Sequence, residues 1–206
     1  MIKEAPRLSR AFFAGETVAV ARALIGARLI IDGGEIVAQI VETEAYLGDR
    51  DEASHAFRGP TPRSQVMFEA PGHLYVYFAY GMHHCANVVT EPAGSAAAVL
   101  LRAAVVEVGE ELVRQRRGVN GALPVTHLLR GPGNLCRGLG LNLQDNGLDL
   151  CAELPRLQIL GGDKPPIEVS SRIGISRNTE ALLRFGWVRH PSVSVPRRRV
   201  ANASVD

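Results

Sequence analysis

The turn sequence Asp32-Gly33-Gly34 separates two segments of strand character and constrains the fold more than any other feature. Residues 28–31 come directly before it, and residues 35–46 follow as a longer, largely apolar segment. Aspartate and glycine in so short a connection favour the tight turns that join antiparallel strands. The sequence therefore predicts a β-hairpin, and with it a sheet built mainly from strands that are neighbours in the chain.

Further segments extend this sheet. Residues 73–89 are aromatic and β-branched but broken by Gly81, which predicts two strands, and residues 96–102 predict another. Residues 157–160 and 167–175 predict short strands and turns.

Helical spacing and terminal signals predict helices over residues 18–24, 105–117 and 134–139. Thr17 would cap the first of them, Gly26 would end it, and Gly140 would close the last. The chain is expected to be an α+β protein, with a curved, mostly antiparallel β-sheet flanked by helices.

The length of 206 residues fits a single domain over residues 1–206, with frayed ends at about 1–8 and 200–206. The sequence contains no repeat and no linker long enough to separate domains. Residues 48–71 and 118–130 predict loops. A loop as long as the first is usually functional in a compact domain.

Composition excludes several classes of protein. Apolar residues make up 46% of the chain, but no apolar run approaches the roughly 20 residues of a membrane helix. Residues 1–7 lack a signal-peptide stretch, so we expect an intracellular, cytoplasmic protein. The three cysteines are odd in number and widely spaced, which favours buried thiols over disulfides or a metal site.

Almost all positive charge is arginine, because Lys3 and Lys164 are the only lysines. Arginine binds phosphate through two parallel hydrogen bonds and stacks on bases, which would suit a nucleic-acid partner. A general codon preference for arginine would give the same composition, and the net charge of +2 does not decide between them.

The strand ending at Tyr46 carries two carboxylates. Side chains alternate along a strand, so Glu42, Glu44 and Tyr46 share one face. The pattern fits either a catalytic face or the solvated face of a half-buried sheet.

Other polar and aromatic residues cluster in sequence. Three of the four tyrosines, Tyr75, Tyr77 and Tyr80, lie in one stretch, which suits the stacking of planar ligands or a tyrosine-rich sheet face. Asn87 and Arg102 interrupt apolar strands, and a buried arginine needs a partner, for which Glu44 is the candidate.

The preceding loop carries His55 and the arginines Arg58 and Arg63. A lone histidine in a loop is commonly a surface or capping residue, and the arginines could contact phosphate or keep the loop soluble.

Taken together, these segments resemble the alkyladenine (3-methyladenine) DNA glycosylase family of the animal type, over about residues 21–194. The landmarks are Val41-Glu42-Thr43-Glu44-Ala45-Tyr46-Leu47-Gly48, Asp51-Glu52-Ala53-Ser54-His55, Thr61-Pro62-Arg63, Met67-Phe68, Leu74-Tyr75-Val76-Tyr77-Phe78-Ala79-Tyr80-Gly81-Met82, Val99-Leu100-Leu101-Arg102-Ala103, Gly131-Pro132-Gly133-Asn134-Leu135-Cys136 and Arg172-Ile173-Gly174-Ile175.

The resemblance implies roles for single residues. Glu44 would be the general base that activates water, and Arg102 its partner in holding that water. The remaining roles are those of the pocket walls Tyr46, His55 and Tyr77, the DNA-intercalating wedge Tyr80, the guanine-excluding Asn87, and the weaker DNA contacts Arg63 and Met82.

The sequence also departs from the family pattern. Ala86 stands where animal members often have methionine, which puts the shape of the pocket floor in doubt. The role of the adjacent His83-His84-Cys85 is open. The chain lacks the long basic N-terminal extension of animal members, as expected of a compact bacterial version.

The implied activity is a monofunctional DNA glycosylase acting on 3-methyladenine, 7-methylguanine, hypoxanthine and ethenoadenine. It would bind double-stranded DNA containing damaged purines as a monomer, without cofactor, metal or membrane, associated with the nucleoid if the protein is bacterial. Strand nicking needs an amine nucleophile, and neither lysine lies near the motifs. A non-catalytic damaged-DNA binding module and a hydrolase of free nucleosides are the alternatives.

Overall fold

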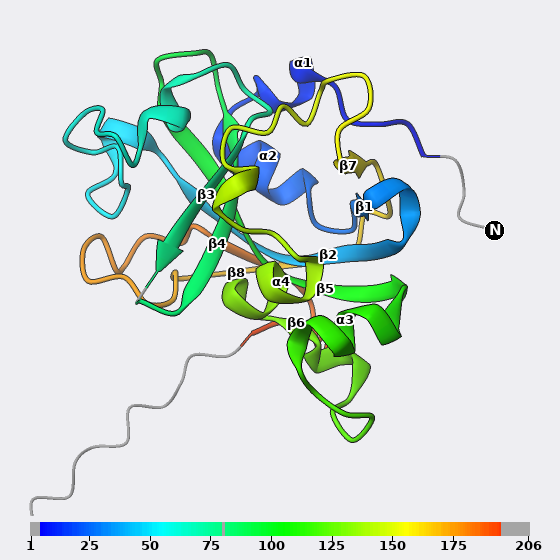
Figure 1. Cartoon of the computed structure of the whole chain (residues 1–206). Coiled ribbons are helices and arrows are strands. Elements are labelled where there is room, and N and C mark those ends of the chain that lie inside the picture. Colours follow the sequence, from blue (N-terminus) through cyan, green and yellow to red (C-terminus); the bar gives the residue numbers. More distant parts are fainter. Residues whose placement is uncertain (1–4, 80, 195–206) are drawn as a thin grey trace, which may run out of the picture.

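The predicted hairpin lies at the centre of the sheet. Strands β1 (Arg28–Ile31) and β2 (Ile36–Tyr46) pair antiparallel across the 3₁₀ turn Asp32–Gly34 (Figure 1). The computed structural model describes residues 5–79 and 81–194. Within that part of the chain, nine strands form one curled, wholly antiparallel sheet, which confirms the predicted α+β class.

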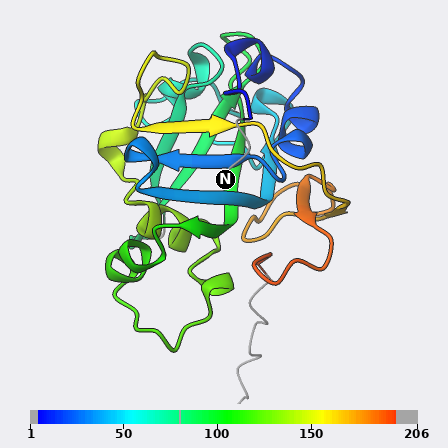
Figure 2. The ribbon, with the colours of Figure 1, turned by 90° about the vertical axis from the view of Figure 1, so that its right-hand side faces the viewer.

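The strand order β3-β4-β5-β2-β1-β7 places the two longest strands side by side in the middle. Its further members are β3 (Leu74–Ala79), β4 (His83–Thr90), β5 (Ala97–Val108) and β7 (Leu157–Leu160). Figure 2 shows β7, β1 and β2 in this order. The short strand β6 (Leu129–Arg130) joins β5, and β9 (Arg184–Trp187) joins the last part of β2 and pairs with β8 (Ile167–Ser170).

Three register shifts interrupt the pairing of the central strands β2 and β5, and two of them lie next to each other within residues 40–43 of β2. Ile40 pairs with Ala104 and Glu42 with Ala103, so the register skips Val41 on β2. The next pair joins Thr43 to Leu101, so the register skips Arg102 on β5. Bulges increase local twist and redirect side chains. These two lie where the acidic segment of β2 meets the arginine of β5.

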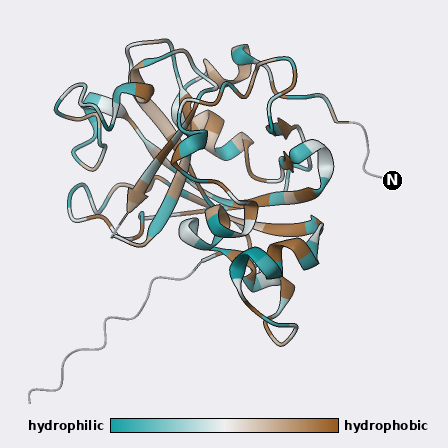
Figure 3. Cartoon of the chain, in the orientation of Figure 1, coloured by the Kyte–Doolittle hydropathy of each residue, from teal (hydrophilic) through white to brown (hydrophobic). Residues whose placement is uncertain are grey.

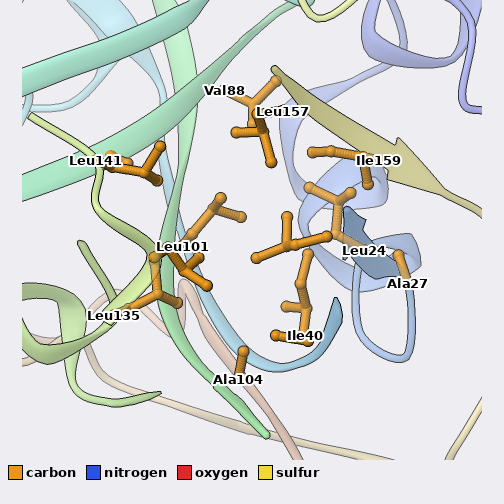
Figure 4. Packing of buried hydrophobic residues seen from close by; sticks show 14 of the residues in the cluster. Leu24, Ala27, Ile40, Val88, Leu101, Ala104, Leu135, Leu141, Leu157 and Ile159 are labelled. Carbon is orange, nitrogen blue, oxygen red and sulfur yellow. The ribbon is translucent and has the colours of Figure 1, made fainter. Parts of the chain in front are cut away.

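Strand alternation gives the sheet two different faces. Leu101, Val99 and Val88 point into the main apolar core, which α2 and α4 cover (Figure 4). Figure 3 shows apolar residues concentrated along the strands. The opposite face carries the polar and aromatic residues, because directly paired residues share a face. Its members are Glu44, Tyr46, Tyr75, Tyr77, Cys85, Asn87 and Leu100.

The first helices differ in detail from the prediction. A short helix α1 (Arg10–Phe13), which the sequence analysis missed, precedes α2 (Thr17–Ala23). The predicted capping by Thr17 is wrong, since the carboxylate of Glu16 accepts from the amides of Val18 and Ala19. The Thr17 hydroxyl is buried and contacts Thr90 instead, at 3.0 Å.

Strand β5 is longer than predicted, and the helix after it is shorter. Residues 105–108 belong to β5, where Val105 and Val106 pair with β2, whereas α3 (Glu110–Arg117) begins only after Gly109. Gly109 has a φ of 81°, and a Cβ there would lie 2.2 Å from the carbonyl oxygen of Glu35. Tertiary pairing therefore overrides a local helical pattern. The last of the three predicted helices, α4 (Pro132–Leu139), ends at Gly140 as predicted.

The remaining segments frame the sheet. Residues 48–71 form a long loop with two 3₁₀ turns, Gly48–Arg50 and Gln65–Phe68. β9 was not predicted. Both ends were expected to fray, and residues 1–4 and 200–206 of these lie outside the described residues. Closer to the first helix, Arg7 forms a β-bridge with Leu160, and the Leu8 amide donates to the carbonyl of Ile159. No helix among the described residues is long and apolar enough to cross a membrane.

Candidate functional site

A pocket of about 430 Å³ opens on the polar face of the sheet. It lies between the loop of residues 48–71, cyan to teal in Figure 1, and the orange segment of residues 173–177. The size is within the usual range of ligand sites, about 300–1,000 Å³. The predicted site residues on its wall are Tyr46, His55, Arg63, Tyr77, Asn87 and Arg102.

Glu44 lies directly behind this wall and is fully buried. Its Oε2 accepts from the Tyr46 hydroxyl at 3.0 Å and lies 3.1 Å from Nη1 of Arg102. The backbone amide of Ile173 donates to Oε1 at 2.8 Å. All three partners belong to residues that line the pocket, so the carboxylate is held at the pocket wall through its own contacts.

Arg102 has the carboxylate partner that the sequence predicted, and a second one besides. Its Nε donates to Oε1 of Glu42 at 3.1 Å, and its Nη2 donates to the Ser194 hydroxyl at 3.2 Å. Since Nη1 faces Glu44, one guanidinium holds two buried carboxylates. The solvated sheet face that the sequence left open is therefore ruled out, because Glu42 and Glu44 both have no exposed surface.

The pKa of Glu44 is raised above its ordinary value of 4.5, because burial outweighs the opposing charge of Arg102 and the hydrogen bonds from Ile173 and Tyr46. A carboxylate with a raised pKa is a stronger base than a solvated one, provided that it is ionised when it acts.

Aromatic rings of three residues meet at the pocket. The rings of His55 and Tyr77 are 4.5 Å apart between centroids and nearly perpendicular, and Tyr75 lies 5.5 Å from Tyr77. The Tyr75 hydroxyl is 3.0 Å from Nδ1 of His55 and fixes the imidazole from behind. Sequence analysis counted Tyr75 among the clustered tyrosines but gave it no role.

His55 keeps part of its surface exposed, yet its packing against the tyrosines and the nearby charge of Arg63 lower its pKa to about 4. The ring is therefore neutral near pH 7. A neutral imidazole does not repel a cationic ligand, and it cannot serve as a strong proton donor at that pH.

Two of the tyrosine rings already carry a guanidinium. Arg63 lies over Tyr77, with its Cζ 4.9 Å from the ring centroid, and Arg172 lies over Tyr46 at 4.6 Å. Both rings are thus used as cation-binding surfaces within this fold. Arg63 also donates to the carbonyl of Phe78 at 3.2 Å, which ties the loop to the end of β3.

The floor of the pocket includes Ala79, Cys85 and Leu100. Asn87 is buried beside it, and its Nδ2 donates to the Tyr75 carbonyl at 3.1 Å, which fixes the orientation of the amide. Burial raises the pKa of the Cys85 thiol, so the sulfur is protonated at neutral pH. Ala86, on the neighbouring strand position, points into the core on the other face.

The predicted DNA-contacting residues at the β3–β4 turn are only partly described. Tyr80, the expected wedge, lies outside the described residues. Met82 is 68% exposed next to Gly81, which has a φ of 67°. His84 packs against Phe78 at 5.2 Å between centroids.

A buried ion pair joins the two segments that frame the pocket. Arg172 contacts the Asp51 carboxylate at 2.5 and 2.8 Å and donates to the Ala45 carbonyl. Burial opposes ionisation of Asp51, but the hydrogen bonds from Arg172 and Asn178 lower its pKa. Both residues were only landmarks of the resemblance, and their pairing could not be read from the sequence because they are 121 positions apart.

Among the described residues, no group of three or more His, Cys, Asp or Glu side chains could hold a metal ion. The pocket wall presents the Arg102 guanidinium and a set of tyrosine and imidazole rings, and the buried carboxylate of Glu44 lies behind it.

Comparison with known proteins matches the sequence of this chain to one family. The sequence model of the methylpurine-DNA glycosylases matches residues 11–191. A relative from Mycobacterium sp. (strain KMS) is 43% identical over 89% of this chain and 90% of its own length. One from Rhodopseudomonas palustris (strain BisB18) is 46% identical over 95% and 94%. Each carries the name "Putative 3-methyladenine DNA glycosylase".

Proposed function

This chain belongs to the methylpurine-DNA glycosylase family, enzymes that hydrolyse N-glycosyl bonds in DNA repair, and we propose that it removes alkylated and deaminated purines from duplex DNA. The proposed substrates are 3-methyladenine, 7-methylguanine, hypoxanthine and ethenoadenine, and the product is an abasic site. The observation that carries the proposal is the buried Glu44–Arg102 pair at the wall of an aromatic pocket.

The damaged base enters the pocket only after it has left the helix. Extruding a nucleotide costs a few kcal/mol, and least where pairing is already weakened. The turn after β3 would fill the gap, with Tyr80 as the wedge and the exposed Met82 beside it. Arg63 would contact the DNA backbone, since its guanidinium already donates to the carbonyl of Phe78 near the same turn.

Recognition rests on the electron-rich ring faces. Purines alkylated at N3 or N7 are cationic, and stacking on a tyrosine contributes about 0.5–2 kcal/mol for each cation–π contact. Arg63 lies over Tyr77 in the free protein, so the base must displace this guanidinium to stack there. Asn87 has its amide tied to Tyr75 and cannot turn away, so it would exclude guanine by contact with the 2-amino group.

Hydrolysis then follows from Glu44. Departure of the base leaves an oxocarbenium-like sugar, which a nearby carboxylate stabilises while it takes a proton from the attacking water. A base stacking on Tyr46 would draw its hydroxyl away from Oε2 of Glu44, and so open the carboxylate to water. Arg102 would hold both the carboxylate and the water in place.

The lysine distribution supports simple hydrolysis over strand nicking. Lys164 is exposed in the segment between β7 and β8, next to Asp163, which contacts Gln39 at the opposite end of β2 from the pocket. Lys3 lies outside the described residues. We therefore propose a monofunctional enzyme. We also propose that it acts as a monomer.

The test compares three substrates at equal concentration: duplexes with a single hypoxanthine or 3-methyladenine, the undamaged duplex, and free inosine. The expected result is free base and an alkali-labile abasic site from the lesion duplexes alone. Tight binding to lesion duplexes without base release would instead identify a non-catalytic binding module. Release from free inosine at a comparable rate would identify a nucleoside hydrolase.

A further inference from the structure

Glu42 is a buried carboxylate that the reaction as described does not use. It has no exposed surface and lies two residues before Glu44 on the same face of β2. Its Oε1 accepts from Nε of Arg102 at 3.1 Å and from Nη1 of Arg184 at 2.9 Å. Ser194 donates to it twice, from the backbone amide at 2.7 Å and from the hydroxyl at 2.9 Å.

Two carboxylates at this depth are costly. Each buried charge loses several kcal/mol of solvation, and like charges close together oppose each other's ionisation. Replacing Glu42 together with its buried charged partners by well-packed apolar residues would avoid this cost, because a buried ion pair adds little net stability. A carboxylate with four donors here therefore requires a reason beyond packing.

The geometry around Arg102 supplies that reason. Each nitrogen of its guanidinium has its own partner, with Nε at Glu42, Nη1 at Glu44 and Nη2 at Ser194. The bulge at Arg102 frees this residue from regular register, so its side chain depends on such contacts for its direction. Glu42 is the partner on the side away from the pocket.

We propose that Glu42, held by Arg184 and Ser194, is a positioning residue that fixes Arg102 against Glu44 and thereby sets the basicity of Glu44. The inference rests on the proposed function. Glu42 divides the charge of Arg102 between two carboxylates, so Glu44 receives only part of its stabilisation. Glu42 also acts on Glu44 directly, as a like charge.

Among the described residues, the charged and titratable groups beside Glu44 come from four strands. They are Glu42 and Tyr46 on β2, Cys85 on β4, Arg102 on β5 and Arg184, which pairs with Glu44, on β9. Loss of the Glu42 charge leaves Arg102 paired to Glu44 alone, so the pKa of Glu44 should fall. Loss of the Nε contact should also let the guanidinium rotate, so the reaction should slow even where Glu44 is ionised.

The test uses Glu42→Gln, with Ser194→Ala as a milder variant and Glu107→Gln as control. Glu107 lies on β5 but pairs with Arg28 away from the pocket. We expect Glu42→Gln to lower the single-turnover rate of base release at least about tenfold, with unchanged affinity for lesion DNA. The acid limb of its pH profile should move to lower pH. Ser194→Ala should change the single-turnover rate and the acid limb in the same direction as Glu42→Gln. Glu107→Gln should change neither quantity.

A second readout does not need activity. The side-chain carboxyl carbon of Glu44, assigned by its loss in Glu44→Gln, is titrated by ¹³C NMR in the wild type and in both variants. A wild type that releases no base overturns the proposed function, while the titration still decides the role of Glu42. The inference alone is overturned if the wild type is active and both variants match it in single-turnover rate, in the acid limb of the pH profile and in the titration of Glu44. Should Glu42→Gln fail to fold, Ser194→Ala decides by the same measures.

Discussion

Glu44 combines full burial with hydrogen bonds to both carboxylate oxygens, and the two have opposite effects on its charge. Burial favours the neutral acid, whereas Arg102, Ile173 and Tyr46 favour the anion, and burial is the larger effect. The side chain is thus held in one orientation and kept a better base than a solvated glutamate. This is the property that a water-activating carboxylate requires.

A pH dependence follows from the direction of this shift. Glu44 must be ionised to accept a proton, and its pKa lies above 4.5, so activity should be lost on acidification at a higher pH than for an ordinary glutamate. The measurement is the single-turnover rate on a hypoxanthine duplex between pH 4 and 8. A rate that stays constant down to pH 4.5 would contradict the assignment.

We expect the Tyr75 hydroxyl to affect recognition of the base rather than the chemical step, because it contacts His55. Tyr75→Phe removes the hydroxyl that holds Nδ1 of His55 and leaves this part-buried nitrogen without that partner, at a cost of about 1 kcal/mol. We expect roughly five- to tenfold weaker binding to a hypoxanthine duplex, with unchanged binding to undamaged DNA, measured by fluorescence anisotropy. Equal loss for both duplexes would show a general defect and not a misplaced His55.

The strands of the sheet could be predicted from the sequence because local signals agree there with the tertiary structure. The hairpin at Asp32 and strands β1, β2, β3, β4 and β7 follow alternation and turn residues. Residues 105–108 were predicted helical, and their place in β5 follows from pairing with β2, which local spacing does not record. The short strand β9 pairs with β2 although its residue Arg184 is 142 positions from its partner Glu42 in the sequence.

The segments framing the pocket depend on one long-range pair. Asp51→Asn should destabilise the protein by about 3 kcal/mol, because it leaves the guanidinium of Arg172 buried without its carboxylate. Urea unfolding measures the change. The control is Glu52→Gln, which removes an exposed pair with Arg177 and should cost less than about 1 kcal/mol. Equal effects of the two changes would remove the special role of the buried pair.

At the scale of the whole molecule, the sequence predicted which residues lie together at the site better than it predicted how deeply they are buried. Glu44, Tyr46, Tyr77 and Asn87 gather on one face because paired strands align them, and Arg102 joins them from a bulge through its contact with Glu44. Burial could not be read from the pattern, since two glutamates on a strand favour a solvated face. The roles of Glu42 and Ser194 could not be predicted from the sequence either, because these residues are far apart in the chain and meet only where the last described segment packs against β2.

The distribution of amines gives a prediction for the intact enzyme. With Lys164 exposed away from the pocket and Lys3 the only other lysine, no Schiff base should form with the sugar. Borohydride added during turnover of a lesion duplex should trap no covalent protein–DNA adduct, whereas a strand-nicking glycosylase run in parallel should give one. An adduct that survives Lys164→Ala would point to Lys3 or to the terminal amine.

The proposed reaction requires Glu44 to act upon water after the base has entered the pocket. Glu44→Gln keeps the size of the side chain and removes its basicity, so lesion binding should persist while the single-turnover rate of hypoxanthine release falls about 100-fold or more. Rate and affinity are measured on the same lesion duplex, with Glu107→Gln alongside as a folded control. Base release by Glu44→Gln at the wild-type rate would contradict the assignment of Glu44 as the general base.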